Sequence, residues 1–123
     1  MARRIVLVDD DKDYSELIAL LLERHGYAVV RVTDGKQAMQ AVQTEPPDAL
    51  ITDCFLPRMD GVHLCKFLRA DPKFRALPML LMSGVLDNEI LARCKEFGIN
   101  AVYEKGTPLE NLVKEVDRLF KQP

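Results

Sequence analysis

Cysteine and histidine are scarce in this sequence and tryptophan is absent, which narrows the kinds of site that it can contain. The three cysteines, Cys54, Cys65 and Cys94, are odd in number and show no CxxC spacing. This pattern indicates neither a zinc site nor a disulfide framework. We therefore expect reduced thiols that pack inside the protein.

Long hydrophobic runs are also missing. No apolar stretch approaches the roughly 18 residues that a membrane-spanning helix requires. The apolar segment that follows Met1 is too short to be the core of a signal peptide, and no small-residue cleavage site follows it. We therefore expect a cytoplasmic protein that does not enter a membrane.

Positive and negative charges are nearly balanced. The chain has 17 lysine and arginine residues against 19 aspartate and glutamate residues, a net charge of −2. This balance gives no general electrostatic reason to bind nucleic acid directly. A nucleotide-binding role also lacks support, because neither a GxGxxG nor a GxxxxGK[ST] motif occurs.

Five short apolar runs alternate strictly with segments of helical periodicity. The 123 residues contain no repeat, linker or low-complexity segment, which predicts a single domain over residues 1–123. Strict alternation of strand and helix predicts a parallel sheet with helices on both faces and right-handed connections. The predicted strands are residues 4–8, 28–32, 49–53, 77–83 and 101–105.

Residues with capping propensity precede each predicted helix. In the first helix, Asp13 is the expected N-cap with Glu16 three residues later, and Leu17, Leu20 and Leu21 are expected to face inward, with Ile18 and Leu22 widening the stripe. The later helices are expected to have caps at Asp34, Asp60, Asp87 and Thr107. The third helix is expected to contain Phe67, the inward face of the fourth includes Leu91, and Phe120 ends the helical repeat of the fifth. Left-handed glycines are expected at Gly26 and Gly98, where the first and fourth helices end.

Reactive residue types end four of the five strands: Asp9 with Asp10, Asp53, Ser83 and Lys105. The carboxyl ends of parallel strands share one edge of the sheet, where chemistry in such folds takes place. Crowded carboxylates repel each other unless a cation is present, and hard oxygen ligands suit Mg²⁺. With an amine and a hydroxyl nearby, a carboxylate is equipped to accept a phosphoryl group.

These motifs, taken in order, resemble the receiver domain of two-component response regulators. The likeness runs from Ile5 to Phe120. The segment 8–11 is similar to the acidic pocket of that family, the segment 53–61 to its phosphoacceptor loop, and Ser83 and Lys105 to its switch hydroxyl and its lysine. The resemblance implies a chemotaxis-regulator-like fold, a doubly wound five-stranded parallel α/β sheet of flavodoxin-like (βα)5 type with strand order 2-1-3-4-5.

The same resemblance implies a function. Asp53 would accept a phosphoryl group from a phosphohistidine on a sensor histidine kinase or a histidine phosphotransfer protein. Mg²⁺ would be bound by Asp10, Asp53 and the main-chain carbonyl of Phe55, with Asp9 acting through water. The domain would catalyse only its own phosphorylation and dephosphorylation, so it would not be an enzyme in the usual sense. It would signal to an output domain or target protein, and a homodimer is compatible with the family.

Three features depart from the family pattern. Gly106 stands where a proline usually follows the lysine, and Val102 stands where an aromatic switch residue is usual, with Tyr103 on the opposite face of the strand. Phe55 and Val85, which would border the phosphoryl group, are apolar, so we expect slow loss of the phosphoryl group. An alternative interpretation is a pseudo-receiver that docks partners without phosphorylation. A haloacid-dehalogenase-type phosphatase would need a second aspartate where Phe55 stands.

Overall fold

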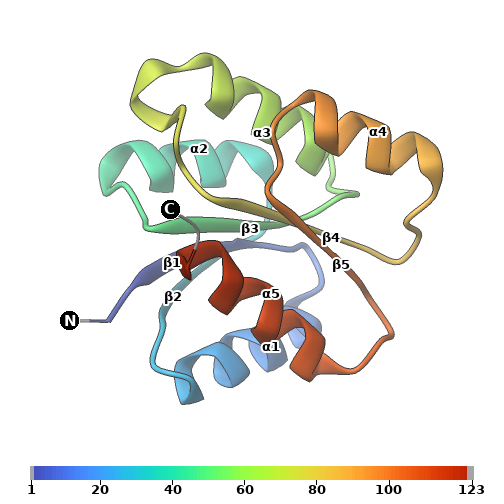
Figure 1. Cartoon of the computed structure of the whole chain (residues 1–123). Coiled ribbons are helices and arrows are strands. Elements are labelled where there is room, and N and C mark those ends of the chain that lie inside the picture. The colour runs from blue at the N-terminus through green and yellow to red at the C-terminus, as the bar shows by residue number, and fades with distance from the viewer. Residues whose placement is uncertain (1, 122–123) are drawn as a thin grey trace.

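The computed structural model describes residues 2–121, so that Met1, Gln122 and Pro123 lie outside the described part of the chain (Figure 1). In chain order the elements are β1 (Arg4–Val8), α1 (Lys12–Arg24), β2 (Ala28–Val32), α2 (Gly35–Thr44), β3 (Ala49–Asp53), α3 (Gly61–Ala70), a 3-10 turn (Pro72–Phe74), β4 (Met79–Ser83), α4 (Asn88–Glu96), β5 (Ala101–Glu104) and α5 (Leu109–Lys121). The strands form one parallel sheet in the order β2-β1-β3-β4-β5, which confirms the predicted fold and strand order.

Helices cover both faces of the sheet (Figure 1). Ile5 and Leu7 of β1 pack with residues of α1 and α5, whereas Val6 and Val8 pack with residues of α2 and α3. All four of these side chains are fully buried. Covering on both faces explains why this strand is a continuous apolar run rather than an alternating one.

The N-cap of α1 differs from the prediction. Asp11, not Asp13, caps the helix, because its side chain accepts the backbone N–H of Tyr14 at 3.1 Å. Several aspartates follow β1, and the helix begins immediately after the last one of the uninterrupted run. The other predicted aspartate caps are confirmed at Asp34, Asp60 and Asp87.

The inward face of α1 was predicted correctly only in part. Leu17 and Leu20 are 47% and 54% exposed, whereas Ile18 and Leu22 are fully buried. The helix is rotated so that its smaller residues, Ser15 and Ala19, face the sheet together with Ile18 and Leu22. Small side chains there allow α1 to approach the sheet closely, and Arg31 of β2 donates to the Ser15 hydroxyl at 3.0 Å.

Two later helices show smaller departures from the prediction. Leu91 of α4 is 40% exposed, although it was expected on the inward face, and Phe67 of α3 is 53% exposed. Thr107 does not cap α5, because its hydroxyl donates to the Glu104 carbonyl and the helix begins at Leu109. Positive φ angles at Gly26 and Gly98 confirm both predicted left-handed glycines.

The two ends of the described chain meet at the edge where β1 begins. The Arg3 guanidinium lies over the Phe120 ring, 4.4 Å from its centroid, and Tyr27 stacks on the same ring at a centroid distance of 5.6 Å. The Tyr27 hydroxyl donates to Asp117 at 2.5 Å, so the residue that precedes β2 is tied to α5 there. Among residues 2–121, no helix is long and apolar enough to cross a bilayer.

Candidate functional site

Three carboxylates converge where β1 and β3 end. The two strands are neighbours, with Val8 in register with Thr52, so the residues that follow them lie side by side. Ligand oxygens of Asp9, Asp10 and Asp53 all lie within 4.8 Å of one another. Asp9 and Asp53 are buried, whereas Asp10 is exposed. The convergence of acidic strand ends expected from the sequence is therefore present in the structure.

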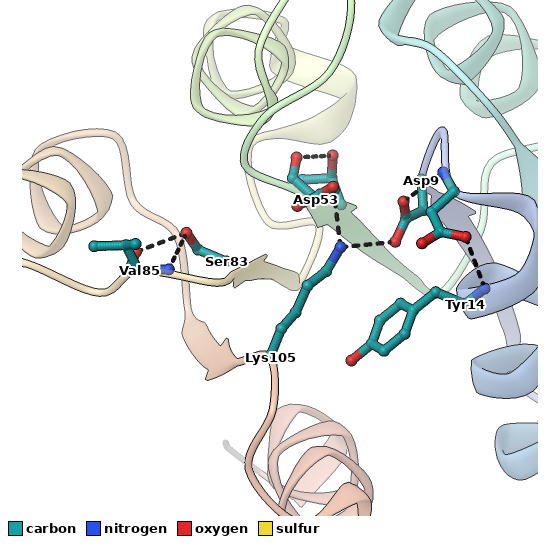
Figure 2. Close-up of polar contacts among 8 residues, drawn as sticks. Asp9, Tyr14, Asp53, Ser83, Val85 and Lys105 are labelled. Atoms are coloured by element: carbon teal, nitrogen blue, oxygen red, sulfur yellow. Dashed lines mark hydrogen bonds and ion pairs between the residues drawn. The ribbon is translucent and has the colours of Figure 1, made fainter.

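Lys105 bridges two of these carboxylates (Figure 2). Its Nζ donates to Asp9 Oδ2 at 3.1 Å and lies 3.1 Å from Asp53 Oδ2. Burial raises the pKa of Asp53, although the hydrogen bond from Lys105 opposes that effect. Burial alone would lower the pKa of Lys105, but its hydrogen bonds to Asp53 and Asp9 outweigh burial and raise that pKa. The amine is therefore held as a cation in the middle of the pocket.

The Ser83 hydroxyl points into the loop that follows β4 and not toward the carboxylates (Figure 2). It is fully buried, donates to the Val85 carbonyl at 2.6 Å and accepts the Val85 N–H at 3.2 Å. Ser83 ends β4 beside β3, on the same edge of the sheet as Asp53. Ser83 therefore ends its strand as predicted from the sequence, but its hydroxyl is hydrogen-bonded to Val85 two residues later.

The loop after β3 is packed tightly against the end of that strand. Gly61, the first residue of α3, faces the Asp53 carbonyl so closely that a β-carbon at position 61 would collide with it. The Gly61 N–H donates to the Cys54 carbonyl at 2.7 Å. Phe55 is 62% exposed, and its main-chain carbonyl accepts no hydrogen bond from the residues that the structure describes. That carbonyl is therefore free to act as a ligand.

Tyr14 belongs to this site, although sequence reasoning did not include it. The Lys105 Nζ lies over the Tyr14 ring, 4.6 Å from its centroid. The Tyr14 hydroxyl is buried without a hydrogen-bond partner among residues 2–121, and burial raises the pKa of this phenol above its usual value. The available sequence signal was an aromatic residue in the first turn of the helix that follows the acidic run.

The structure also shows where the residues that depart from the family pattern lie. Tyr103 packs in the core between the sheet, α1 and α5, and its hydroxyl donates to the Thr107 carbonyl at 2.6 Å. Val102 packs on the other side with residues of α4, as expected for neighbouring residues of a strand. Gly106 has a φ of 93°, a left-handed conformation that favours glycine.

The donor set fits a hard divalent cation. Mg²⁺ prefers oxygen ligands at about 2.1 Å in octahedral geometry and keeps several waters. The carboxylate oxygens of Asp9, Asp10 and Asp53, which lie within 4.8 Å of one another, are hard donors of the kind that this ion prefers.

Comparisons with known proteins agree with this geometry. The profile of the Response regulator receiver domain family matches residues 5–117. The transcriptional regulatory protein PhoP for alkaline phosphatase synthesis, from Bacillus subtilis, is 41% identical over 84 residues, which cover 68% of this chain and 34% of that protein. The chain spans half or less of the length of the curated relatives it matches.

Solved structures are similar over nearly the whole chain. A candidate response regulator from Chloroflexus aurantiacus has a TM-score of 0.94 at 33% identity, covering 99% of this chain and 100% of that one. The receiver domain of a sensor histidine kinase from Pseudomonas aeruginosa has a TM-score of 0.89 at 26% identity, covering 99% and 100% of the two chains. That structure holds a magnesium ion coordinated in its active-site cleft.

Proposed function

Because the chain belongs to the response regulator receiver domain family, we propose that it accepts a phosphoryl group on Asp53 and changes conformation in response. Receiver domains work with histidine kinases, so the donor would be a phosphohistidine on a sensor histidine kinase or a histidine phosphotransfer protein. The observation that carries this proposal is the buried Asp53 carboxylate beside Asp9, Asp10 and Lys105 at one edge of the sheet.

In the proposed reaction an Asp53 carboxylate oxygen attacks the phosphorus atom. The new oxygen–phosphorus bond forms as the phosphorus–nitrogen bond to the donor imidazole breaks, and the imidazole leaves with the bonding electron pair and takes up a proton. Lys105 Nζ, 3.1 Å from Asp53 Oδ2, is placed to attract an oxygen of the transferred group. Catalysis of this kind depends on positioning and on neutralising charge.

Mg²⁺ would be held by Asp9, Asp10, Asp53 and the main-chain carbonyl of Phe55. When bound it would neutralise the negative charge of the carboxylates and of the incoming phosphoryl group. The family resemblance implies that Asp9 would contact the metal through water and not directly.

The proposed conformational response starts at Ser83. Its hydroxyl would leave the Val85 carbonyl and donate to a phosphoryl oxygen on Asp53, carrying residues 84–87 with it. A charge-assisted hydrogen bond contributes about 1.5–3 kcal/mol. A differential interaction of that size shifts the population of a two-state loop by about one to two orders of magnitude.

The acceptor is tested with acetyl phosphate and Mg²⁺, with intact mass spectrometry as the readout. Wild type should gain one phosphoryl group and Asp53→Asn should gain none while keeping its fold. Asp13→Asn, a change at an exposed aspartate of α1, is the matched control and should label like wild type. Labelling of Asp53→Asn at the wild-type rate would place the acceptor elsewhere.

The metal site is tested with Asp10→Asn. Asp10 is exposed and has no ion pair with Lys105, so the substitution removes repulsion from the pocket without breaking a contact. Mg²⁺ affinity should fall strongly, whereas the metal-free protein should gain about 0.5–1 kcal/mol of stability. A metal-free variant that melts below wild type would contradict the crowding of the three carboxylates.

Phosphorylation-independent docking is the second candidate function. It is favoured by the Ser83 hydroxyl, which is already satisfied by Val85, and by Val102 at the position of the usual aromatic switch. Beryllofluoride with Mg²⁺ separates the two candidates, because a receiver should show chemical-shift changes around Ser83 and residues 84–87 that a docking module would not show.

The proposed phosphoryl group should be long-lived. Phe55 and Val85 are 62% and 56% exposed and would border it without an amide or carboxylate that could orient an attacking water. Phe55→Asn and Val85→Glu should therefore lose the group faster than wild type. If wild type and both polar variants lose the phosphoryl group at the same rate, then the apolar side chains do not slow the attack of water.

A further inference from the structure

Lys105 is held from a third side by an aromatic ring. Two carboxylate oxygens, Asp9 Oδ2 and Asp53 Oδ2, each lie 3.1 Å from Nζ, and the Tyr14 ring centroid lies 4.6 Å from it (Figure 2). An ammonium within about 6 Å of a ring centroid and over its face is attracted by the ring quadrupole. The ammonium therefore contacts two groups that carry charge and one that is neutral.

Tyr14 is fixed in place by its own element. It lies in the first turn of α1, and its backbone N–H donates to the capping carboxylate of Asp11 at 3.1 Å. Its ring packs against the core cluster that α1 and α5 share with the sheet. The ring is thus a firm surface beside Lys105, whose own side chain is long and flexible.

We propose that Tyr14 is a positioning residue, whose ring holds the Lys105 ammonium at the phosphoacceptor site during phosphoryl transfer to Asp53. This inference rests on the proposed phosphoacceptor function. The two carboxylates that hold Lys105 in this structure are the groups whose charge changes when a divalent cation binds and when Asp53 becomes esterified. The ring attraction does not depend on either change, so it keeps the ammonium in position when its other partners are altered.

The hydroxyl of Tyr14 has no part in this role. It is buried without a hydrogen-bond partner among the described residues, so the contact with Lys105 belongs to the ring face alone. Phenylalanine should therefore preserve the effect, and an aliphatic side chain should abolish it. This contrast separates ring support from a need for the phenol.

The experiment compares Tyr14→Phe and Tyr14→Leu for the rate of labelling by acetyl phosphate at saturating Mg²⁺. Tyr14→Phe should stay within about twofold of wild type, and Tyr14→Leu should be slower by roughly threefold to thirtyfold, the range that a single cation–π contact supports. In a Lys105→Gln background, Tyr14→Leu should have no further effect, because the group that the ring supports is gone.

A second readout does not depend on phosphoryl transfer. The ε-methylene protons of Lys105 should resonate upfield in wild type and Tyr14→Phe, owing to the ring current, and return to ordinary values in Tyr14→Leu. The Lys105→Gln spectrum identifies the signal by its loss. Tyr14→Met provides a second non-aromatic variant if Tyr14→Leu does not fold.

The outcomes are distinct. Equal labelling rates in wild type and a folded non-aromatic variant would overturn the positioning role, and so would an ordinary ε-methylene shift in wild type. An additive loss in the Lys105→Gln background would assign the effect of Tyr14 to packing and would also overturn it. Absence of labelling in wild type, with the ring-current shift present, would instead refute the phosphoacceptor function on which the role depends.

Discussion

The α-carbon of Gly61 faces the carbonyl oxygen of Asp53, with no space between them for a side chain. This contact joins the first turn of α3 to the residue that ends β3, and the Gly61 N–H bond to the Cys54 carbonyl fixes it further. The φ of Gly61 is not in the left-handed region, so glycine is required here for closeness and not for backbone conformation.

Gly61→Ala should therefore lower stability. A β-carbon at position 61 meets backbone atoms of Asp53, which cannot move aside without shifting the strand end, and overpacking of this kind costs about 1–3 kcal/mol. Gly84→Ala is the matched control, because a β-carbon there meets nothing within 4 Å, and it should change stability by no more than about 0.5 kcal/mol. Urea denaturation of the two variants provides the measurement. A loss that is equal in both would argue against the close contact.

Arg58→Gly should raise stability. Arg58 has a φ of 72°, the one positive value among the non-glycine residues that the structure describes, and a left-handed conformation costs such residues about 1–2 kcal/mol. Glycine removes that strain but increases the entropy of the unfolded chain, so the net gain should be about 0.5–1 kcal/mol. Arg58→Ala keeps the strain and should show no gain. If alanine stabilises as much as glycine, the effect belongs to the arginine side chain.

Tyr27 should make stability sensitive to alkaline pH. Burial and the hydrogen bond to Asp117 raise the pKa of Tyr27 from 10.0 to about 12. The folded-state pKa lies above the unfolded one, so the contribution is complete below about pH 10 and is lost as the pH rises toward about 12. Tyr27→Phe should be less stable by about 1 kcal/mol near neutral pH.

The difference between Tyr27→Phe and wild type should shrink as the pH rises. Urea denaturation of both proteins at about pH 8, 10 and 11 measures it, and the comparison cancels the titration of other groups. A gap that stays constant over this range would mean that the pKa of Tyr27 is not raised in the folded protein.

The thiols should react slowly with disulfide reagents in the folded protein. Cys54, Cys65 and Cys94 are all free and buried, which confirms the packed thiols expected from the sequence. Burial raises the pKa of Cys54 to about 11 and that of Cys65 to about 12, and it raises the pKa of Cys94 as well. Because the thiolate is the reactive form, reaction with a disulfide reagent at neutral pH should follow the unfolding rate. Rapid reaction of one thiol in native buffer would show that its region opens locally.

The sheet and its acidic edge could be predicted because their signals are local. The continuous apolar run that ends at Asp9 requires a strand buried on two faces, and the run that ends at Asp53 carries the same information. Alternation of strands with helices then brings the strand ends to one edge. Aspartate caps at Asp34, Asp60 and Asp87 were readable for the same reason, since a cap acts within three residues.

The rotation of α1 could not be predicted in this way. Leu17, Leu20 and Leu21 satisfy helical spacing as well as Ile18 and Leu22 do, so periodicity alone leaves two inward faces. The choice depends on which face can approach the sheet, and that depends on residues of other strands such as Arg31. Tyr14 was missed for a related reason, because its partner Lys105 lies at the far end of the sequence. The orientation of the Ser83 hydroxyl could not be predicted either. The apolar run predicts that Ser83 ends a strand, but it does not predict the rotamer of its side chain.

The contact between Arg3 and the Phe120 ring places the beginning of β1 next to the end of α5, at the edge of the sheet opposite the acidic pocket. A short peptide linker could therefore join these two positions, and the chain could be reopened in a surface loop on the same side, without touching Asp53. Circular permutants of this kind would change the order of the strands along the chain while preserving their order in the sheet. A fluorescent reporter attached at this edge would likewise stay clear of a docking phosphodonor, so both the pocket and the loop after β4 would remain accessible during a labelling assay.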